Sequence, residues 1–279
     1  MFYRRVRPRP PLASFVSCLW YSEGLEGTHE RERLLPNGES GIVFDLREDG
    51  RRSNGDRSPI RICDAEGDGG FKSFAPAVFS GARTDSFLLD TSEQERVIGI
   101  QFLPGGAFPF LAMPACEVAH ATFSLDDIWP GEALLLREEL MSAKDVGLMF
   151  AILERALLAR LNHAAAFDPA IAFAVASLGG FGSPVRVAAV ADQVGMSARR
   201  FIETFRERTG LTPKAFQRVR RFQRALKTLH AKANWAGLAA DCGYYDQPHF
   251  IHDFKLFSGM TPGEYMAVAT PHLNHIPLK

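Results

Sequence analysis

The chain has 279 residues, of which 46% are hydrophobic and 23% are charged, as is typical of a folded globular protein. This length is sufficient for two ordinary domains. The sequence contains no run of about 18 apolar residues, which argues against a membrane span, and its basic N-terminus lacks the apolar stretch of a signal peptide. Four widely spaced cysteines, Cys18, Cys63, Cys116 and Cys242, favour reduced thiols in the cytoplasm over disulfides or a structural zinc site.

The net charge of zero hides an uneven distribution of charge. From Ser183 to the C-terminus there are 14 basic and 7 acidic residues, whereas the preceding residues comprise 18 basic and 25 acidic ones. Five of the eight histidines also lie in the C-terminal segment. A basic segment joined to an acidic one predicts an anionic partner for the basic segment alone. Charge by itself does not single out nucleic acid, because many protein surfaces are basic.

The residues from Phe15 to Phe110 are dense in glycine and proline, with short apolar runs between these breaks. Runs such as GIVFDL (41–46) and RVIGIQFL (96–103) are typical of strands, so we expect a mainly antiparallel β-domain. The polar stretch REDGRRSNGDRSP (47–59) predicts a hairpin loop or a mobile insertion.

Three helices are expected after the β-domain. The first two span residues 131–142 and 145–161, the second with an apolar stripe along one side. The third, FDPAIAFAVASLGG, carries a complete set of boundary signals, with Asp168 as N-cap, Pro169 in the first turn and two glycines at the end. We place the domain boundary just before it, so that residues 1–164 form one domain and residues 165–279 the other.

The C-terminal segment contains an internal repeat. The stretch VAAVADQVGMSARRFIETFRERTGLTPKAF (187–216) is similar to WAGLAADCGYYDQPHFIHDFKLFSGMTPGEY (235–265). Phe201 matches Phe250 and Gly210 matches Gly259 at an offset of 49 residues, which falls to 48 upstream of Tyr244-Tyr245. One residue is therefore inserted there in the second copy, and one structural explanation must serve both copies.

Each copy has the pattern of a helix, a tight glycine turn and a second helix. Ser197 and Asp246 stand at the N-cap of the second helix in the two copies. This is the helix-turn-helix pattern, in which the second helix enters the major groove of DNA. The sequence therefore predicts two recognition helices on one chain.

A helical wheel separates the buried side of each recognition helix from its exposed side. Phe201 and Phe205 face inward in the first copy, as do Phe250 and Phe254 in the second. The side chains on or beside the outward face are candidates for DNA contact, and they are Arg199, Arg200, Glu203 and Arg206 in the first copy and Gln247, His249, His252 and Lys255 in the second.

His249 and His252 could also be half of a metal site, because they lie three residues apart on a helix and imidazole binds zinc, copper and nickel. Their positions match Arg200 and Glu203, however, and the repeat supplies no further ligands. We therefore expect no metal here, and weigh DNA contact against an ordinary solvated helix face.

The stretch PKAFQRVRRFQRALKTLHAKAN (213–234) joins the two copies. Its apolar residues recur at helical spacing, which predicts one long linking helix. Its charged side, with Arg218 and Arg221, is then available to DNA phosphates. A rigid linking helix would fix the second recognition helix relative to the first, so that one monomer reads two blocks about one turn of DNA apart.

The repeat, the linking helix and the closing stretch GYYDQPHFIHDFKLFSGMTPGEY (243–265) resemble the AraC/XylS family of bacterial transcription regulators, from about Asp168 to Met266. Four earlier stretches resemble the sensor domain that precedes this unit in one subgroup, namely LLPNGESGIVFDL, SGARTD, RVIGIQFLPGGAFPFL and FSLDDIWPGEALLLREEL. The resemblance implies an α+β chain, with a cupin-like β-domain and trailing helices followed by an all-α domain of two helix-turn-helix units joined by a long helix.

The resemblance also implies a function. The chain would be a sequence-specific regulator that binds the major groove of double-stranded DNA in the bacterial cytoplasm. A small-molecule effector or self-association as a homodimer would control it through the N-terminal domain, and contact with RNA polymerase is left open. We expect no catalysis, cofactor or metal, because the N-terminal histidines His29, His120 and His163 are too far apart for the His/Glu cluster of a cupin enzyme.

Two alternatives remain from other classes of protein. DNA-repair methyl-acceptor proteins also carry an AraC-type unit in some cases, but their chemistry needs an activated cysteine and a cysteine-ligated zinc, which four scattered cysteines do not favour. An AraC-type unit that has become a protein-interaction module should have lost its basic residues, and here they are present.

Overall fold

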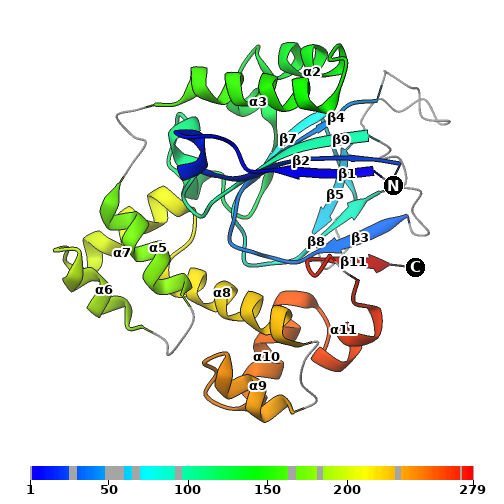
Figure 1. Ribbon diagram of the computed structural model, residues 1–279. Coiled ribbons are helices and arrows are strands. Elements are labelled where there is room, and N and C mark those ends of the chain that lie inside the picture. Colours follow the sequence, from blue (N-terminus) through cyan, green and yellow to red (C-terminus); the bar gives the residue numbers. More distant parts are fainter. Residues whose placement is uncertain are drawn as a thin grey trace.

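The computed structural model shows a β-domain above a group of helices (Figure 1). It describes residues 2–24, 30–47, 60–64, 70–91, 96–162, 168–180, 185–229, 234–270 and 272–278. Most of the polar stretch 47–59, the histidines at 29 and 163, and the expected domain boundary at residues 164 and 165 lie outside this part of the chain.

The N-terminal domain consists of two antiparallel sheets. The first contains β1 (Phe2–Val6), β2 (Val16–Glu23), β9 (Arg96–Phe102), β4 (Gly41–Asp45), β7 (Ala77–Ser80) and β10 (Thr122–Ser124), in that order. The second contains β11 (His275–Leu278), β3 (Arg31–Leu34), β8 (Phe87–Asp90), β5 (Ile60–Asp64) and β6 (Lys72–Phe74). The runs GIVFDL and RVIGIQFL form β4 and β9, as expected.

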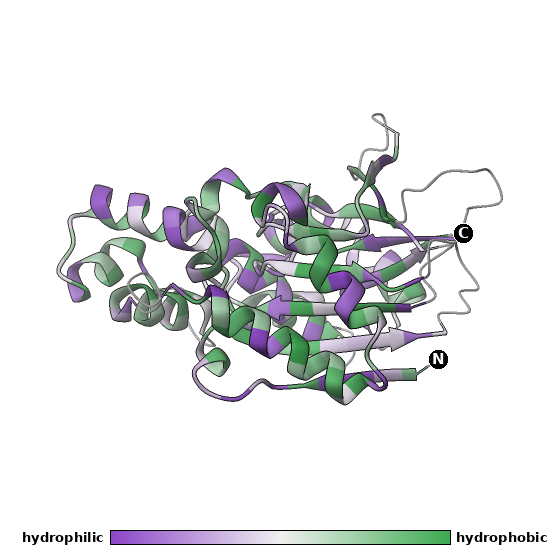
Figure 2. Cartoon of the chain, turned by 90° about the horizontal axis from the view of Figure 1, so that it is seen from above, coloured by the Kyte–Doolittle hydropathy of each residue, from purple (hydrophilic) through white to green (hydrophobic). Residues whose placement is uncertain are grey.

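The two sheets pack against each other as in a β-sandwich, with Ile60 and Ile62 of the second sheet against Val78 of the first. Figure 2 shows hydrophobic and hydrophilic residues interspersed along the strands and the helices. Alternate side chains of a strand point to opposite faces, and the apolar ones meet between the sheets or beneath the helices.

Three helices after β10 cover the first sheet. Figure 1 shows two of them, α2 and α3, above β4, β7 and β9. The three helices are α1 (Leu125–Ile128), α2 (Ala133–Met141) and α3 (Val146–Arg160). Short 3-10 helices η1 (Leu12–Ser14), η2 (Phe108–Phe110) and η3 (Ala115–Glu117) lie between other elements. The largest core joins these helices to the sheet, and both helices expected from the sequence are confirmed within two residues at each end.

The C-terminal segment is mainly helical. Its elements are α5 (Pro169–Gly179), α6 (Val187–Gln193), α7 (Ala198–Thr209), α8 (Pro213–Thr228), α9 (Trp235–Asp241), α10 (Gln247–Ser258) and α11 (Pro262–Val268). Asp168 caps α5 as expected, because its carboxylate accepts a hydrogen bond of 3.0 Å from the backbone N–H of Ala170. No helix in the described residues is long and apolar enough to cross a membrane.

The linking helix α8 contributes to the cores of both repeat copies. Phe216, near its start, packs on Phe205 of the first copy with 5.6 Å between ring centroids. Phe222, six residues later, packs on Phe254 of the second copy at 5.3 Å. All four rings are buried. Both copies therefore pack on the same linking helix, as the sequence predicts. This helix ends at Thr228, and residues 230–233 lie outside the described part of the chain.

The C-terminal strand β11 is a feature that the sequence did not predict. After α11 the chain returns to the N-terminal domain, and β11 pairs with β3 so that Ile276 lies opposite Arg33. Ile276 is 1% exposed and shares the core of the second repeat copy with Leu35 of the N-terminal domain. The last residues therefore belong to a β-sheet and attach the second copy to the N-terminal domain.

The N-terminal domain contacts both recognition helices at equivalent places. Gly210 and Gly259, which are offset by 49 residues, end α7 and α10 with left-handed φ angles of 86° and 74°. A Cβ on Gly210 would lie 3.2 Å from the carbonyl oxygen of Ala115, and one on Gly259 only 2.0 Å from a guanidinium nitrogen of Arg33. The left-handed φ angles favour glycine at both positions, and the N-terminal domain approaches each recognition helix there.

Candidate nucleic-acid interface

The first copy forms a helix-turn-helix from α6 and α7. Gly195 has a φ of 68° in the turn, which a residue with a side chain rarely adopts. Ser197 then caps α7, because its hydroxyl accepts a hydrogen bond of 3.4 Å from the N–H of Arg200. Phe201 and Phe205 are fully buried, so the opposite face of α7 is turned outward.

The second copy repeats this geometry with α9 and α10. Gly243 takes a φ of 79°, and the carboxylate of Asp246 accepts a hydrogen bond of 2.8 Å from the N–H of His249. The match extends to the far end of the recognition helices. The hydroxyl of Thr209 donates to the carbonyl of Phe205 at 2.8 Å, and that of Ser258 donates to the carbonyl of Phe254 at 2.7 Å.

The outward face of α7 carries the four polar residues that the sequence indicates. Arg199, Arg200, Glu203 and Arg206 are all exposed. The guanidinium of Arg199 donates to Glu203 at 2.9 Å, one helical turn away, and this hydrogen bond raises the pKa of Arg199. The face therefore offers donors from three arginines and an acceptor from one carboxylate.

The outward face of α10 is less basic and more varied. His252 and Lys255 are exposed, whereas Gln247 and His249 are half-buried. Tyr245 lies at the N-terminal end of this helix with 92% of its surface exposed, and it belongs to the pair where the second copy has its extra residue. The sequence marked that insertion without indicating a site, so Tyr245 is a candidate contact that helical spacing alone could not find.

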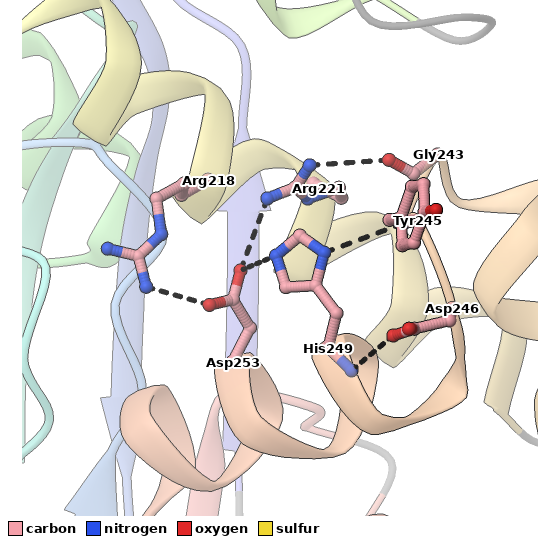
Figure 3. A network of polar contacts seen from close by, with 7 residues as sticks. All are labelled: Arg218, Arg221, Gly243, Tyr245, Asp246, His249 and Asp253. Carbon is pink, nitrogen blue, oxygen red and sulfur yellow. Dashed lines mark hydrogen bonds and ion pairs between the residues drawn. The ribbon is translucent and has the colours of Figure 1, made fainter.

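Asp253 is the centre of a polar network that joins α10 to α8 (Figure 3). Its side chain is 2% exposed. One carboxylate oxygen accepts a hydrogen bond of 2.7 Å from Arg218, and the other accepts one of 3.2 Å from Arg221 and lies 3.7 Å from Nε2 of His249. Arg221 also donates to the carbonyl of Gly243 at 3.2 Å. Asp253 thus connects the linking helix, the turn and the recognition helix.

A groove with a volume of about 540 Å³ lies along α8, between the end of α5 and the recognition helix α10. Its polar lining is mostly basic and comes from α8 and α10, namely Lys214, Gln217, Arg218, Arg221, Arg224, His249, His252 and Asp253. Residues at the end of α5 and just before α6 form the other wall. A groove of this charge beside the recognition helix α10 suits a phosphate backbone better than an apolar ligand.

Residues 190–267 of the chain match a family model described as a helix-turn-helix domain. This segment is an AraC-type helix-turn-helix domain. Residues 4–124 match a family described as a domain of unknown function, DUF6597. No curated protein matches the chain.

Solved structures of transcription regulators resemble the AraC-type domain. One from Chromobacterium violaceum with an AraC-type DNA-binding domain is 25% identical, covers 37% of this chain and 95% of its own, and has a TM-score of 0.34. A probable AraC family regulator from Rhodopseudomonas palustris is 24% identical, with coverage of 37% and 100% and a TM-score of 0.33. ToxT from Vibrio cholerae, solved with an unsaturated fatty acid, is 10% identical, with coverage of 90% and 94% and a TM-score of 0.45.

The linking helix of the AraC-type domain departs from the expectation that its charged side is open to phosphates. Only 16% of the Arg221 side chain is exposed, against 37% for Arg218. Arg220 lies 3.7 Å from Glu39 of the N-terminal domain, and Arg224 donates to the carbonyl of Gly180 at 2.7 Å. Most of these guanidinium groups have partners within the protein. DNA contact by Arg218 and Arg221 therefore stays a prediction, with less exposed surface to support it.

Glu39 illustrates how tightly the N-terminal domain meets α8. Burial raises the pKa of its carboxyl group, while Arg220 and Arg5 act against this shift. Nearby, the amide of Gln223 on α8 donates to the carbonyl of Pro36 at 2.8 Å and to the side chain of Asn274 at 2.8 Å. The linking helix is thus held from outside the AraC-type domain as well as from within it.

His249 and His252 stay predicted as residues that do not bind metal. Within the described residues no three histidine, cysteine or acidic side chains form a group that could hold a metal ion. We expect zinc or nickel titrations of the chain to show no stoichiometric binding that His249→Ala with His252→Ala removes. Calorimetry on both proteins would check this, and a bound metal lost only from the double variant would favour a metal site.

Proposed function

We propose that the chain is a sequence-specific transcription regulator in which one monomer reads two short blocks of a DNA duplex with α7 and α10. The observation that carries this proposal is the shared linking helix. Phe216 and Phe222 of α8 pack in the cores of the two copies, so both recognition helices are fixed on one rod with their polar faces outward. A rigid pair of recognition helices fits two successive turns of the major groove.

The residue types on the two helices suggest how the bases are read. Arg199 and Arg206 can each donate two hydrogen bonds to the edge of a guanine, and Glu203 can accept one from the amino group of cytosine. On α10, Gln247 suits adenine, while His252 and Lys255 supply donors. Lys214 in the basic groove can reach a phosphate between the blocks without reading any base.

We infer that the N-terminal domain controls this reading, through a small-molecule effector or through self-association as a homodimer. Its contacts with both recognition helices, at Gly210 and Gly259, supply the physical connection. As a bacterial DNA-binding protein, the chain would act in the cytoplasm, with RNA polymerase as a further partner. We expect no catalysis. The methyl-acceptor alternative gains no support, because Cys18, Cys63 and Cys242 are buried and only Cys116 is partly exposed.

The test selects binding sites from random DNA duplexes and compares the base preference of the wild type with that of variants at exposed residues. Arg199→Ala and Arg206→Ala should each change the preferred bases in one block, because a good bidentate contact is worth about 1–3 kcal/mol of discrimination. Lys214→Ala should weaken binding to all DNA sequences alike. Arg155→Ala, an exposed arginine on α3, is the matched control and should change neither property. Identical motifs for the wild type and both α7 variants would refute the assignment.

A further inference from the structure

A buried carboxylate is an unexpected component of a DNA-binding groove, because it opposes the attraction between basic residues and phosphate. Asp253 lies on the recognition helix α10 and lines the basic groove, yet it is 2% exposed. Removing a carboxylate from water is costly unless its partners are well placed. The position of Asp253 is therefore better explained by its contacts with other side chains of the protein than by contact with DNA.

The partners of Asp253 lie on the linking helix α8, against which the recognition helix α10 must be oriented. Arg218 and Arg221 both extend from α8, and each donates to a different oxygen of the carboxylate. Arg221 is further restrained, because its guanidinium lies 4.5 Å from the centre of the Tyr244 ring and donates to Gly243 in the turn. The network therefore fixes the angle between α8 and α10 and keeps two cations within the protein.

His249 links this network to the outward face of α10. The backbone N–H of Tyr245 points to Nδ1 of His249 at 3.5 Å, which leaves Nε2 directed to Asp253 at 3.7 Å. The imidazole is thus oriented from both sides (Figure 3). A half-buried side chain with one orientation can read bases more selectively than one that rotates freely.

The first copy has a different residue at the corresponding position. Thr204 lies 49 residues before Asp253, and it carries no charge. The carboxylate is therefore specific to the second copy, the one in which an extra residue lengthens the turn before the recognition helix.

We propose that Asp253 is a positioning residue for DNA recognition, which orients the second recognition helix and restrains Arg218 and Arg221 from binding phosphates indiscriminately. This inference rests on the proposed DNA-binding function. In Asp253→Asn the side chain keeps its size, but its amide can accept from one arginine while its NH₂ group faces the other. Arg218, which is the more exposed of the two, is then released into the groove.

The experiment measures the affinity of the full chain for its selected site and for unrelated duplex DNA over a range of salt concentrations. For unrelated DNA, Asp253→Asn should bind several-fold more tightly at low salt. The slope of log K against log salt should become more negative by about 0.9, as expected for one additional phosphate contact. Discrimination within the second block should fall about tenfold, whereas the first block should be read as before.

Two further variants separate positioning from a mere change of charge or loss of stability. Asp241→Asn, on the exposed end of α9, makes the same charge change in the same copy and should leave second-block discrimination intact. In the Asp253→Asn background, Arg218→Gln should restore the wild-type salt slope, because the arginine released into the groove is then absent.

The outcomes are distinct. If the wild-type chain shows no salt-dependent DNA binding, the proposed function fails. If the wild type binds two blocks and Asp253→Asn matches it in salt slope and second-block discrimination, the positioning role is wrong. A double variant, Asp253→Asn with Arg218→Gln, that keeps the steeper slope of Asp253→Asn would also overturn it, since Arg218 would then not be the released phosphate contact.

Discussion

Inserting about five base pairs between the two blocks should reduce the affinity of the chain to that of one block alone, because half a turn moves the second major groove to the far side of the duplex. Phe216 and Phe222 fix both copies on α8, so α10 cannot follow that rotation. If a block is read through two good contacts worth about 2–6 kcal/mol together, affinity falls about 30-fold or more. Fluorescence anisotropy with spacer variants measures this loss.

A longer insertion provides the control. About ten base pairs return the groove to the original face but place it about 34 Å further along the DNA. We expect affinity to stay at the single-block level, because a helix cannot lengthen to follow. Equal affinity at every spacing would mean that only one of α7 and α10 reads bases.

Replacing Ile276 by alanine should lower the free energy of unfolding by about 2–5 kcal/mol, the usual cost of removing a large aliphatic side chain from a core. Ile276 is 1% exposed and lies in the same core as Leu35 and Phe222. The loss would therefore fall where the N-terminal domain and the second copy meet. Chemical denaturation of the full chain measures it.

Val268 is the matched control for this prediction. It lies at the end of α11, in the same C-terminal region, and 42% of its surface is exposed. Val268→Ala should change stability by less than about 0.5 kcal/mol. If the two variants unfold at the same denaturant concentration, β11 does not stabilise the second copy.

The parts of this molecule that the sequence predicts well depend on local signals. Ser197 and Asp246 are typical N-caps, the phenylalanines recur at helical spacing, and glycine stands where the backbone needs a positive φ. Each signal acts within a few residues and occurs twice in the repeat. The two helix-turn-helix units, their outward faces and the linking helix therefore follow from the sequence.

The features that were missed depend on contacts between distant residues. The strand β11 has the sequence HIPL, in which a proline weakens any strand signal, and it forms because β3 offers a free edge more than two hundred residues earlier. Asp253 falls between the buried and outward faces of α10 on a helical wheel. Its pairing with Arg218 and Arg221 depends on how α8 crosses α10, which no local pattern specifies.

The same reasoning explains why the linking-helix arginines Arg218 and Arg221 are less exposed than their spacing indicates. Helical spacing places Arg218 and Arg221 on the polar side of α8, and a polar side is ordinarily exposed. In the folded chain that side meets α10, so a buried carboxylate occupies these arginines. Spacing shows which residues share a face, whereas tertiary packing decides what covers it.

The central claim is that two recognition helices of one chain enter successive major grooves on one face of the duplex. Interference by methylation of guanine N7, which lies in the major groove, tests this directly on a site selected by the full chain. We predict two clusters of interfering guanines with centres about 10–10.5 base pairs apart. A single cluster, or binding that is indifferent to N7 methylation, would contradict the account.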